Sequence, residues 1–215
     1  GGPATVIAAL LEVLGKKGTL VVPIFTYKHE AEAHPVIDPI NDPSEMGIIT
    51  ETVRLRPDAL RSIAFRHSFA AVGRRARVIT EVDPALSEFD PRSSFGVLLS
   101  LNAKILLMGV TYSSSTSHHF AEYACEVPYR HIIERHVNII RKDGSLTPQV
   151  MTDYQPLTYT GSRATDLNRL GKILEDQGLV RRTAIGNSIV RCYALRDIID
   201  LAMVETQKDY NIFRT

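Results

Sequence analysis

The feature that most constrains the fold is a short apolar run that passes directly into a hydroxyl-rich loop and then into a helical pattern. Residues 104–110 read Lys-Ile-Leu-Leu-Met-Gly-Val, which indicates a buried strand that ends at a glycine. Every residue of 111–117 carries a hydroxyl group, so this loop offers N-caps for a helix starting near His118. Strand, polar loop and helix N-terminus in this order are typical of the ligand-binding edge of α/β proteins. We therefore predict a layered α/β fold with a ligand site after this strand.

The remaining segments favour the same fold class. Pro3 opens an amphipathic helix that ends near Gly15 to Gly18, and a buried strand at 19–25 follows it closely, as expected for α/β layering. Asp42-Pro43-Ser44-Glu45 has the N-cap, proline and glutamate of a helix start, which predicts a helix from there to about Arg56. The other predicted elements are a loop at 28–46, a strand at 68–72, a β-hairpin at 131–154, helices near 163–176 and 195–208, and a strand pair around 186–188.

Composition limits the possible classes of protein. The 215 residues are 44% hydrophobic with a net charge of +1, which excludes collagen-like, coiled-coil and disordered chains and gives no general attraction to nucleic acid or to an anionic membrane. No apolar run reaches the roughly 18–20 residues of a membrane span, and no signal-type segment opens the chain, so we expect a cytoplasmic protein. Cys125 and Cys192 lack a CxxC spacing and are expected to be reduced thiols.

The strongest chemical signal lies at the start of the helix after the hydroxyl-rich loop. His119 and Glu122 are i, i+3 neighbours, so the carboxylate can orient the imidazole, and a neutral imidazole is the side chain best suited to take a proton near neutral pH. Two alternatives stay open at this point. These residues could be capping and surface residues, or His118, His119, Glu122 and Cys125 could bind a metal, although the i, i+4 histidine pair of helical zinc sites is absent.

Charge is distributed unevenly along the chain. Residues 28–54 hold six acids and two bases, whereas 54–77 hold seven arginines and one acid. An acidic stretch beside an arginine-rich one suits a site that binds a cationic molecule and a phosphorylated one. The planar guanidinium of arginine can donate two parallel hydrogen bonds to phosphate. Two ordinary solvated faces are the alternative interpretation.

Several common mechanisms lack their motif. The chain has no GxSxG nucleophile elbow, no GxxxxGK[ST] phosphate loop and no GxGxxG dinucleotide turn. It also lacks the Arg/Gln-x-x-Gly-x-Gly/Ala loop with which the general acetyltransferase (GNAT) superfamily holds coenzyme A.

Taken together, the blocks of this sequence resemble the aminoglycoside 3-N-acetyltransferase (antibiotic N-acetyltransferase) family. The blocks that carry the resemblance keep their order along the chain: 1–7, 18–27, 42–47, 61–62, 67–73, 106–110 and 116–122. The resemblance implies one α/β domain over 1–215, distinct from the general acetyltransferase fold. It also implies transfer of acetyl from acetyl-coenzyme A, as co-substrate and without a metal, to an amine of an aminoglycoside or other amino sugar.

His119 matches the active-site histidine of the family and Glu122 the acidic residue that follows it. We expect His119 to be the general base of a direct transfer, with Glu122 holding its orientation. Backbone N–H groups of the following helix, with the hydroxyls of Ser115 or Thr116, are expected to stabilise the oxyanion.

The other candidate contacts come from the two charged stretches. The expected cofactor-binding residues include, besides Ser115 and Thr116, Arg61, Arg66, His67 and Ser68. Asp38 and Asp42 are the candidates for the ammonium groups of the acceptor.

The chain departs from the family pattern at three places. It begins just after the first strand and Ser-Ser-Leu turn of the family, Ala64-Phe65 replaces a common His-Pro, and Ser115 stands where Asn is frequent. A missing strand would leave a sheet edge that favours a homo-oligomer. Two other functions are a metal-dependent hydrolase with His119 and Glu122 as ligands, and a non-catalytic homologue that binds coenzyme A or a sugar.

Overall fold

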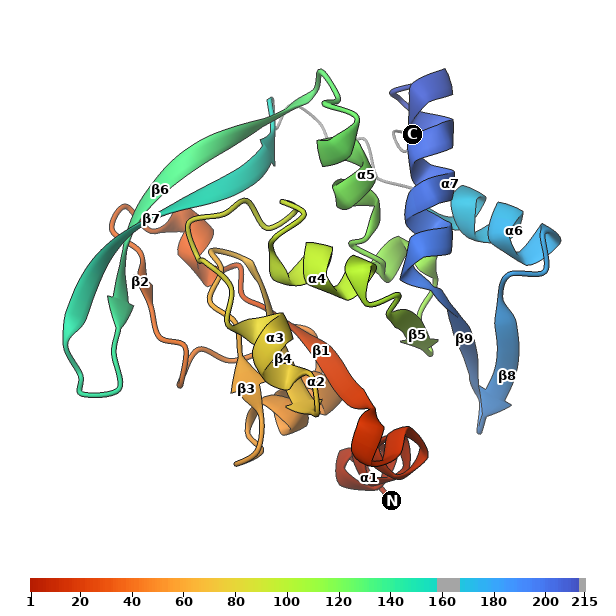
Figure 1. Ribbon diagram of the computed structural model, residues 1–215, viewed down its shortest axis with the longest axis horizontal. Coiled ribbons are helices and arrows are strands. Elements are labelled where there is room, and N and C mark those ends of the chain that lie inside the picture. Colours follow the sequence, from red (N-terminus) through yellow and green to blue (C-terminus); the bar gives the residue numbers. More distant parts are fainter. Residues whose placement is uncertain (158–166, 213–215) are drawn as a thin grey trace. The chain divides into compact units, whose positions relative to one another are not determined.

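The computed structural model describes residues 1–157 and 167–212, and these form two compact units (Figure 1). The first unit consists of Gly1–Glu88, Arg92–Val97 and Ile132–Tyr154. The second consists of Phe89–Pro91, Leu98–His131 and the described residues from Gln155 onward. The α/β class predicted from the sequence is confirmed, whereas one domain over 1–215 stays a prediction.

The first unit is built on an antiparallel sheet with the strand order β1-β4-β3. The predicted strands are present as β1 (Thr19–Phe25) and β4 (His67–Gly73), which pair from Thr19 opposite Gly73 to Phe25 opposite His67. β4 is central and buried along 67–72, as its uninterrupted run of small and apolar residues requires. The other elements here are β3 (Leu60–Arg61), α1 (Pro3–Leu14), η1 (Gly15–Lys17), η2 (Lys28–Ala31), α2 (Ile48–Arg54) and α3 (Ala76–Thr80).

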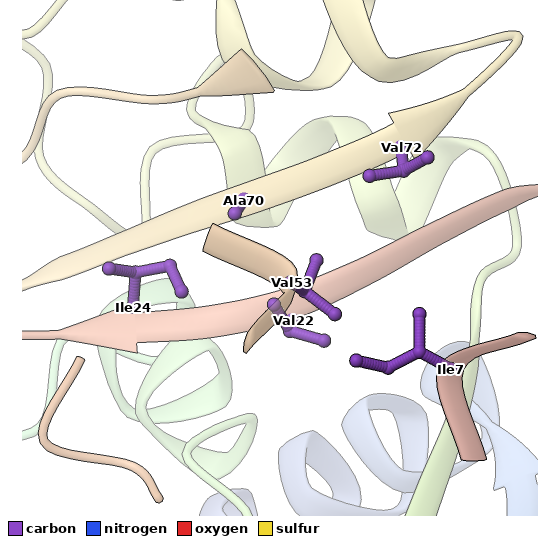
Figure 2. Packing of buried hydrophobic residues seen from close by; sticks show 6 residues of the cluster. All are labelled: Ile7, Val22, Ile24, Val53, Ala70 and Val72. Carbon is purple, nitrogen blue, oxygen red and sulfur yellow. The ribbon is translucent and has the colours of Figure 1, made fainter. Parts of the chain in front are cut away.

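The core of this unit lies between the sheet and the two helices α1 and α2. Figure 2 shows side chains from four elements pointing toward one another: Ile7, Val22, Ile24, Val53, Ala70 and Val72. Ile7 is the buried residue of the apolar stripe on α1, and Val53 is its counterpart on α2. Alternate residues of β1 and β4 reach this face because side chains of a strand alternate between the two sides of a sheet.

Helix α2 begins five residues later than the capping pattern predicts. The expected N-cap was Asp42, but the helix starts at Ile48 after Gly47. The polar groups of 42–45 bind the end of β1 and the residues after it instead. Glu45 N donates to Phe25 O at 3.0 Å, and Glu45 Oε1 accepts from Tyr27 N at 2.9 Å. These longer-range hydrogen bonds replace the local capping bonds that the pattern implies.

The predicted hairpin is confirmed as β6 (Arg130–Ile140) and β7 (Leu146–Pro156), with β2 (Val36–Ile37) parallel to β6. Its apolar face packs with Phe65 and Ile37. Asp153 is fully buried and lies 2.6 Å from Arg66 and 3.1 Å from Arg135. Two cations therefore compensate the buried carboxylate at the base of the hairpin.

The second unit is built on a sheet with the order β5-β9-β8. Its strands are β5 (Lys104–Met108), β8 (Arg181–Ile185) and β9 (Ser188–Ala194), and the last two form the predicted strand pair around 186–188. Its helical elements are η3 (Tyr112–Ser114), α5 (His118–Ala124), α6 (Asn168–Asp176) and α7 (Leu195–Lys208), while α4 (Ser94–Ser100) runs from the first unit into the second. The helix predicted near 163–176 begins at Asn168 with Leu167 as its N-cap, and residues 163–166 of the prediction lie outside the described residues.

The helices in the described part of the chain are all too short or too polar to cross a bilayer.

Gly171 allows α6 to pack closely on the loop that precedes α5. A Cβ built on Gly171 would lie 2.0 Å from the ring of Tyr112. That ring is buried, its hydroxyl donates to Glu175 at 2.9 Å, and Arg191 lies 5.4 Å from its centroid. The hydroxyl-rich loop is thus held against α6 and β9 through one aromatic side chain.

We expect Gly171→Ala to destabilise the protein by about 1–3 kcal/mol, the usual cost of overpacking. A loss of stability would be informative, because alanine in a helix is otherwise about 1 kcal/mol more favourable than glycine. Urea denaturation measures the effect. In a Tyr112→Ala background the added Cβ meets no ring, so most of the cost should disappear. A Gly171→Ala protein as stable as the unaltered one would contradict this packing argument.

Candidate functional site

The centre of the candidate site is an imidazole–carboxylate pair on one face of α5. His119 Nδ1 lies 2.6 Å from Glu122 Oε2, the contact expected from the i, i+3 spacing. The side chain of Glu122 is 2% exposed and that of His119 is 17% exposed. The carboxylate is therefore interior, while the imidazole reaches solvent.

This geometry determines which ring nitrogen of His119 can act as a base. An ionised carboxylate only accepts hydrogen bonds, so Nδ1 must donate to Glu122. In the neutral ring the lone pair then lies on Nε2. The pair can take a proton at Nε2 while Glu122 stabilises the imidazolium that forms.

Two further residues contact Glu122, and sequence reasoning missed both. Tyr129 Oη donates to Glu122 Oε1 at 2.9 Å, and Arg130 Nε lies 2.7 Å from Oε2. Both residues follow the end of α5 at Ala124, so no helical spacing connects them to Glu122. The signal that could have found them is a tyrosine and an arginine placed directly after Pro128, within a turn's reach of the helix.

His118 has a structural role beside the pair. It is buried, its Nδ1 lies 3.0 Å from Ser115 O, and its ring centroid is 3.7 Å from that of His119. Burial, assisted by the neighbouring His119, holds the pKa of His118 well below its ordinary value. A neutral His118 can stack against His119 without charge repulsion. Phe89 covers His119 from another direction, at 5.6 Å between centroids.

The hydroxyl-rich loop does not cap α5 in the predicted way. Ser117 precedes the helix but makes no side-chain cap; its hydroxyl pairs with that of Ser115 at 2.7 Å instead. Ser115 also accepts a hydrogen bond from Tyr193 Oη at 3.4 Å, and both serines are buried. Thr116 is partly exposed, and its backbone oxygen accepts from His119 N at 3.1 Å. Of the two expected hydroxyl contacts, Thr116 is the one with access to a ligand.

The contact between His119 and Glu122 also bears on the metal interpretation. Ligand atoms of His118, His119 and Glu122 lie within 4.8 Å of one another. Tetrahedral zinc ligands at their usual bond lengths are about 3.4 Å apart. The 2.6 Å between His119 Nδ1 and Glu122 Oε2 is a hydrogen-bond distance. The arrangement therefore favours a proton-transfer pair over a metal centre.

The acidic candidates Asp38 and Asp42 are used inside the first unit. Asp42 is 3% exposed, and its carboxylate contacts Lys28, His29 Nε2 at 2.9 Å and Asp38 N at 2.8 Å. Asp38 Oδ1 accepts from Ile40 N and Asn41 N, both at 3.0 Å. Both carboxylates thus bind groups of the chain itself, and their predicted contacts with ammonium groups stay predictions.

The arginine candidates are likewise bonded to the chain itself. Arg61 donates to Asp42 O at 2.6 Å and to Ser68 Oγ at 3.3 Å, and burial lowers its pKa to about 10. Ser68 Oγ in turn donates to Ile24 O at 2.7 Å. The structure thus brings together Arg61, Ser68 and Asp42, but their hydrogen bonds connect β4 to the 38–42 loop.

Arg66 and His67 meet at a second buried carboxylate, Glu88. The backbone nitrogens of both residues donate to Glu88 Oε1, at 2.8 and 3.0 Å, and the His67 ring contacts Oε2. Ala64, His67 and Glu88 line a cavity of about 20 Å³, enough for one water molecule and not for a coenzyme. Arg66 and His67 make these internal contacts in the first unit, and their predicted contacts with the cofactor stay predictions. Ser115, Thr116, His119 and Glu122 belong to the second unit.

Comparison with known proteins gives one consistent result. A family model described as aminoglycoside 3-N-acetyltransferase matches residues 1–206. Aminoglycoside N(3)-acetyltransferase IV of Salmonella sp is 30% identical over 212 residues, which are 99% of this chain and 77% of the relative.

Solved structures agree with the sequence comparison. A histidine-to-alanine variant of aminoglycoside acetyltransferase AAC(3)-IVa in complex with a gentamicin superposes with a TM-score of 0.75 at 27% identity, covering 99% of this chain and 77% of that one. AAC-IIIb in a binary complex with CoASH has a TM-score of 0.84 at 21% identity, covering 96% of this chain and 84% of that one. At that identity the second likeness shows the fold alone.

The contacts of Asp42 predict a pH-dependent stability. Burial alone would raise its pKa, but hydrogen bonds from His29 and Lys28 outweigh burial and lower the pKa to about 2 from an ordinary 3.8. For His29, burial alone would lower the pKa, but hydrogen bonds to Asp42 and Glu32 outweigh it and raise the pKa above 6.5. The Asp42 contribution is lost as pH falls toward 2, and the His29 contribution is lost as pH rises through its raised pKa. Both are complete between about pH 4 and 6.5.

We expect Asp42→Asn to lower the free energy of unfolding by about 3 kcal/mol at pH 5.5, because it leaves Lys28 and His29 without their carboxylate. The loss should be smaller at pH 9, because the His29 contribution is lost as pH rises through its raised pKa. Urea denaturation at the two pH values measures the difference. Asp58→Asn, which removes an exposed partner of Arg56, is the control and should cost less than about 0.5 kcal/mol at both. Equal losses for Asp42→Asn at pH 5.5 and 9 would refute the His29–Asp42 linkage.

Proposed function

The chain belongs to the aminoglycoside 3-N-acetyltransferase family, and from this premise we propose that it is an enzyme that transfers acetyl from acetyl-coenzyme A to an amine of an aminoglycoside or another amino sugar. The gentamicin complex of one relative supports the acceptor class, and the family of N-acetyltransferases supports an acetyl donor as co-substrate. The observation that carries the proposal in this chain is the His119–Glu122 pair, with an interior carboxylate and an accessible imidazole.

The reaction has a proton problem that this pair can solve. An amino-sugar ammonium must lose a proton before its nitrogen can attack the thioester carbonyl. His119 Nε2 takes that proton while Glu122 stabilises the imidazolium. His119 passes this first proton to solvent. As the new C–N bond forms, its Nε2 accepts the second proton of the attacking nitrogen, and as the C–S bond breaks the imidazolium donates that proton to the departing thiolate of coenzyme A.

No covalent acyl-enzyme is needed for this transfer, and neither cysteine is required. Cys125 Sγ lies 3.9 Å from Met203 O, and burial raises the pKa of its thiol, which lowers its thiolate fraction. The transfer we propose is direct.

The oxyanion of the tetrahedral intermediate needs hydrogen-bond donors. We assign this role to the Thr116 hydroxyl and to backbone N–H groups at the junction of the loop with α5. The hydroxyl of Ser115 is bonded to Ser117 and Tyr193 in the interior, so we assign Ser115 the role of holding the loop in place. The cofactor-binding roles predicted for Arg61, Arg66, His67 and Ser68 find no support in their internal hydrogen bonds, so the proposed mechanism does not use them.

The cytoplasmic location, the homo-oligomer and the absence of nucleic-acid binding stay predictions from the sequence. None of them is needed for the proposed reaction.

His119→Ala should lower kcat by about 10²-fold or more with little change in the KM for acetyl-coenzyme A, because proton abstraction contributes to the transition state and not to cofactor binding. Glu122→Gln should cost less, since it keeps a hydrogen-bond acceptor and loses the charge. Free-thiol release from acetyl-coenzyme A, followed over a panel of aminoglycosides and simpler amines, measures both.

The control is His34→Ala, because His34 is exposed whereas His118 is buried and its removal would disturb the fold. Unchanged turnover in His119→Ala would rule out His119 as the base. Turnover abolished by EDTA and restored by zinc would favour the hydrolase or another metal enzyme. Coenzyme binding without turnover on any amine would favour the non-catalytic homologue.

A further inference from the structure

We propose that Arg130 acts as a counter-charge that keeps His119 in its neutral, proton-accepting form, with Tyr129 holding the carboxylate that connects them. This positioning role rests on the proposed function, because it assumes that His119 is the base. It concerns two residues that touch Glu122 and do not touch the reacting atoms.

The geometry is a shared oxygen. Glu122 Oε2 lies 2.6 Å from His119 Nδ1 and 2.7 Å from Arg130 Nε. The side chain of Arg130 is 14% exposed, so water screens this cation only weakly. One carboxylate oxygen therefore divides its negative charge between an imidazole and a guanidinium.

The second oxygen is held by a neutral donor. Tyr129 Oη donates to Glu122 Oε1 at 2.9 Å. With Arg130 on one oxygen and Tyr129 on the other, rotation of the carboxylate about its last bond breaks a contact on either side. The carboxylate plane is thereby held with Oε2 toward His119.

A catalytic need explains why a cation is placed here. A buried carboxylate at 2.6 Å with no other partner would bind the imidazolium strongly, and His119 would stay protonated near neutral pH. A protonated imidazole cannot accept a proton from the substrate. Arg130 opposes this in two ways, because it draws charge from the shared oxygen and because its own positive charge disfavours a second cation nearby. The cost is a weaker base, and the gain is a larger neutral fraction at neutral pH.

The surroundings of the pair are consistent with this balance. On α5 itself His118 lies against His119, and burial keeps His118 neutral, so it adds no charge. Phe89 contributes an apolar ring. Helix α7 packs on α5, and the thiol of Cys125, the residue after α5, lies 3.9 Å from Met203 O of α7; burial raises the pKa of this thiol. Tyr129 and Arg130 come from the segment after α5, and Arg130 brings a cation to Glu122.

The test is the titration of His119 in Arg130→Met, read in two ways. NMR titration of the histidine ring signals, assigned with the His119→Ala protein, gives the midpoint without any substrate. The pH profile of kcat/KM gives the acidic limb in the working enzyme. We expect both to move to higher pH by about one pH unit. At a fixed pH on that limb, a midpoint higher by about one pH unit should lower the activity about tenfold, beyond any loss at the plateau.

Matched variants separate this role from a general structural one. Arg130→Lys keeps the charge and should return the midpoint to within a few tenths of a pH unit of the original. Arg182→Met removes another arginine–carboxylate pair of the same unit, with Glu175 at 2.9 Å, and should leave both readouts unchanged. Tyr129→Phe removes one hydroxyl and should move the midpoint in the same direction by less than Arg130→Met does.

An unchanged or lower His119 midpoint in Arg130→Met would overturn the proposal, and so would an equal change in Arg182→Met. If Arg130→Met does not fold, Tyr129→Phe decides, and a midpoint at or below the original would count against us. If the unaltered protein shows no acetyl transfer while the NMR midpoint still moves as expected, the proposed function fails and the coupling between Arg130 and His119 stands.

Discussion

A single buried carboxylate, Glu122, is the group on which the candidate site depends. Burying an ionised carboxylate without partners costs several kcal/mol, so the surrounding chain must supply donors or cations. The imidazole of His119, the hydroxyl of Tyr129 and the guanidinium of Arg130 meet that need. The path of the chain from α5 into the segment that begins β6 is therefore coupled to the orientation of the proposed base. Residues that satisfy the carboxylate also set its effect on the imidazole.

Buried carboxylates in the first unit need partners as well, and this need explains many contacts of the charged residues there. Asp153 is met by Arg66 and Arg135, and Glu88 by His67 and two backbone nitrogens. Burial alone would raise the pKa of Glu88, but the neighbouring His67 outweighs burial and lowers the pKa to about 2. Part of each charged segment thus serves the interior of this unit, through contacts such as Arg54 with Glu51 and Arg66 with Glu30, whereas Arg74, Arg75 and Arg77 are exposed. This differs both from a pair of ligand-binding patches and from two plainly solvated faces.

Departures from the family pattern gain a physical meaning from these contacts. Phe65 is 1% exposed and packs among the apolar side chains of the hairpin, with Arg135 at 5.1 Å from its ring centroid. The Ala64-Phe65 change is therefore a change in packing beneath the hairpin, with Ala64 at a cavity of one water. Ser115 keeps a hydrogen-bonding group in the loop, but uses it toward Tyr193 and Ser117.

What the sequence determined by itself is the part of the structure governed by local rules. The apolar periodicity of α1, the strands β1, β4 and β5, and the i, i+3 contact of His119 with Glu122 all follow from the geometry of one helix or one strand. The burial predicted for β5 is wrong, because Leu107 alone of its five residues is buried. The start of α2, the missing side-chain cap at Ser117 and the internal use of Asp42 and Arg61 did not follow. Only the tertiary structure decided these, and it alone brought Tyr129 and Arg130 to Glu122. The physical reason is that a polar side chain binds whichever partner best compensates its burial, and that partner comes from whichever segment the fold brings near, at no fixed spacing along the chain.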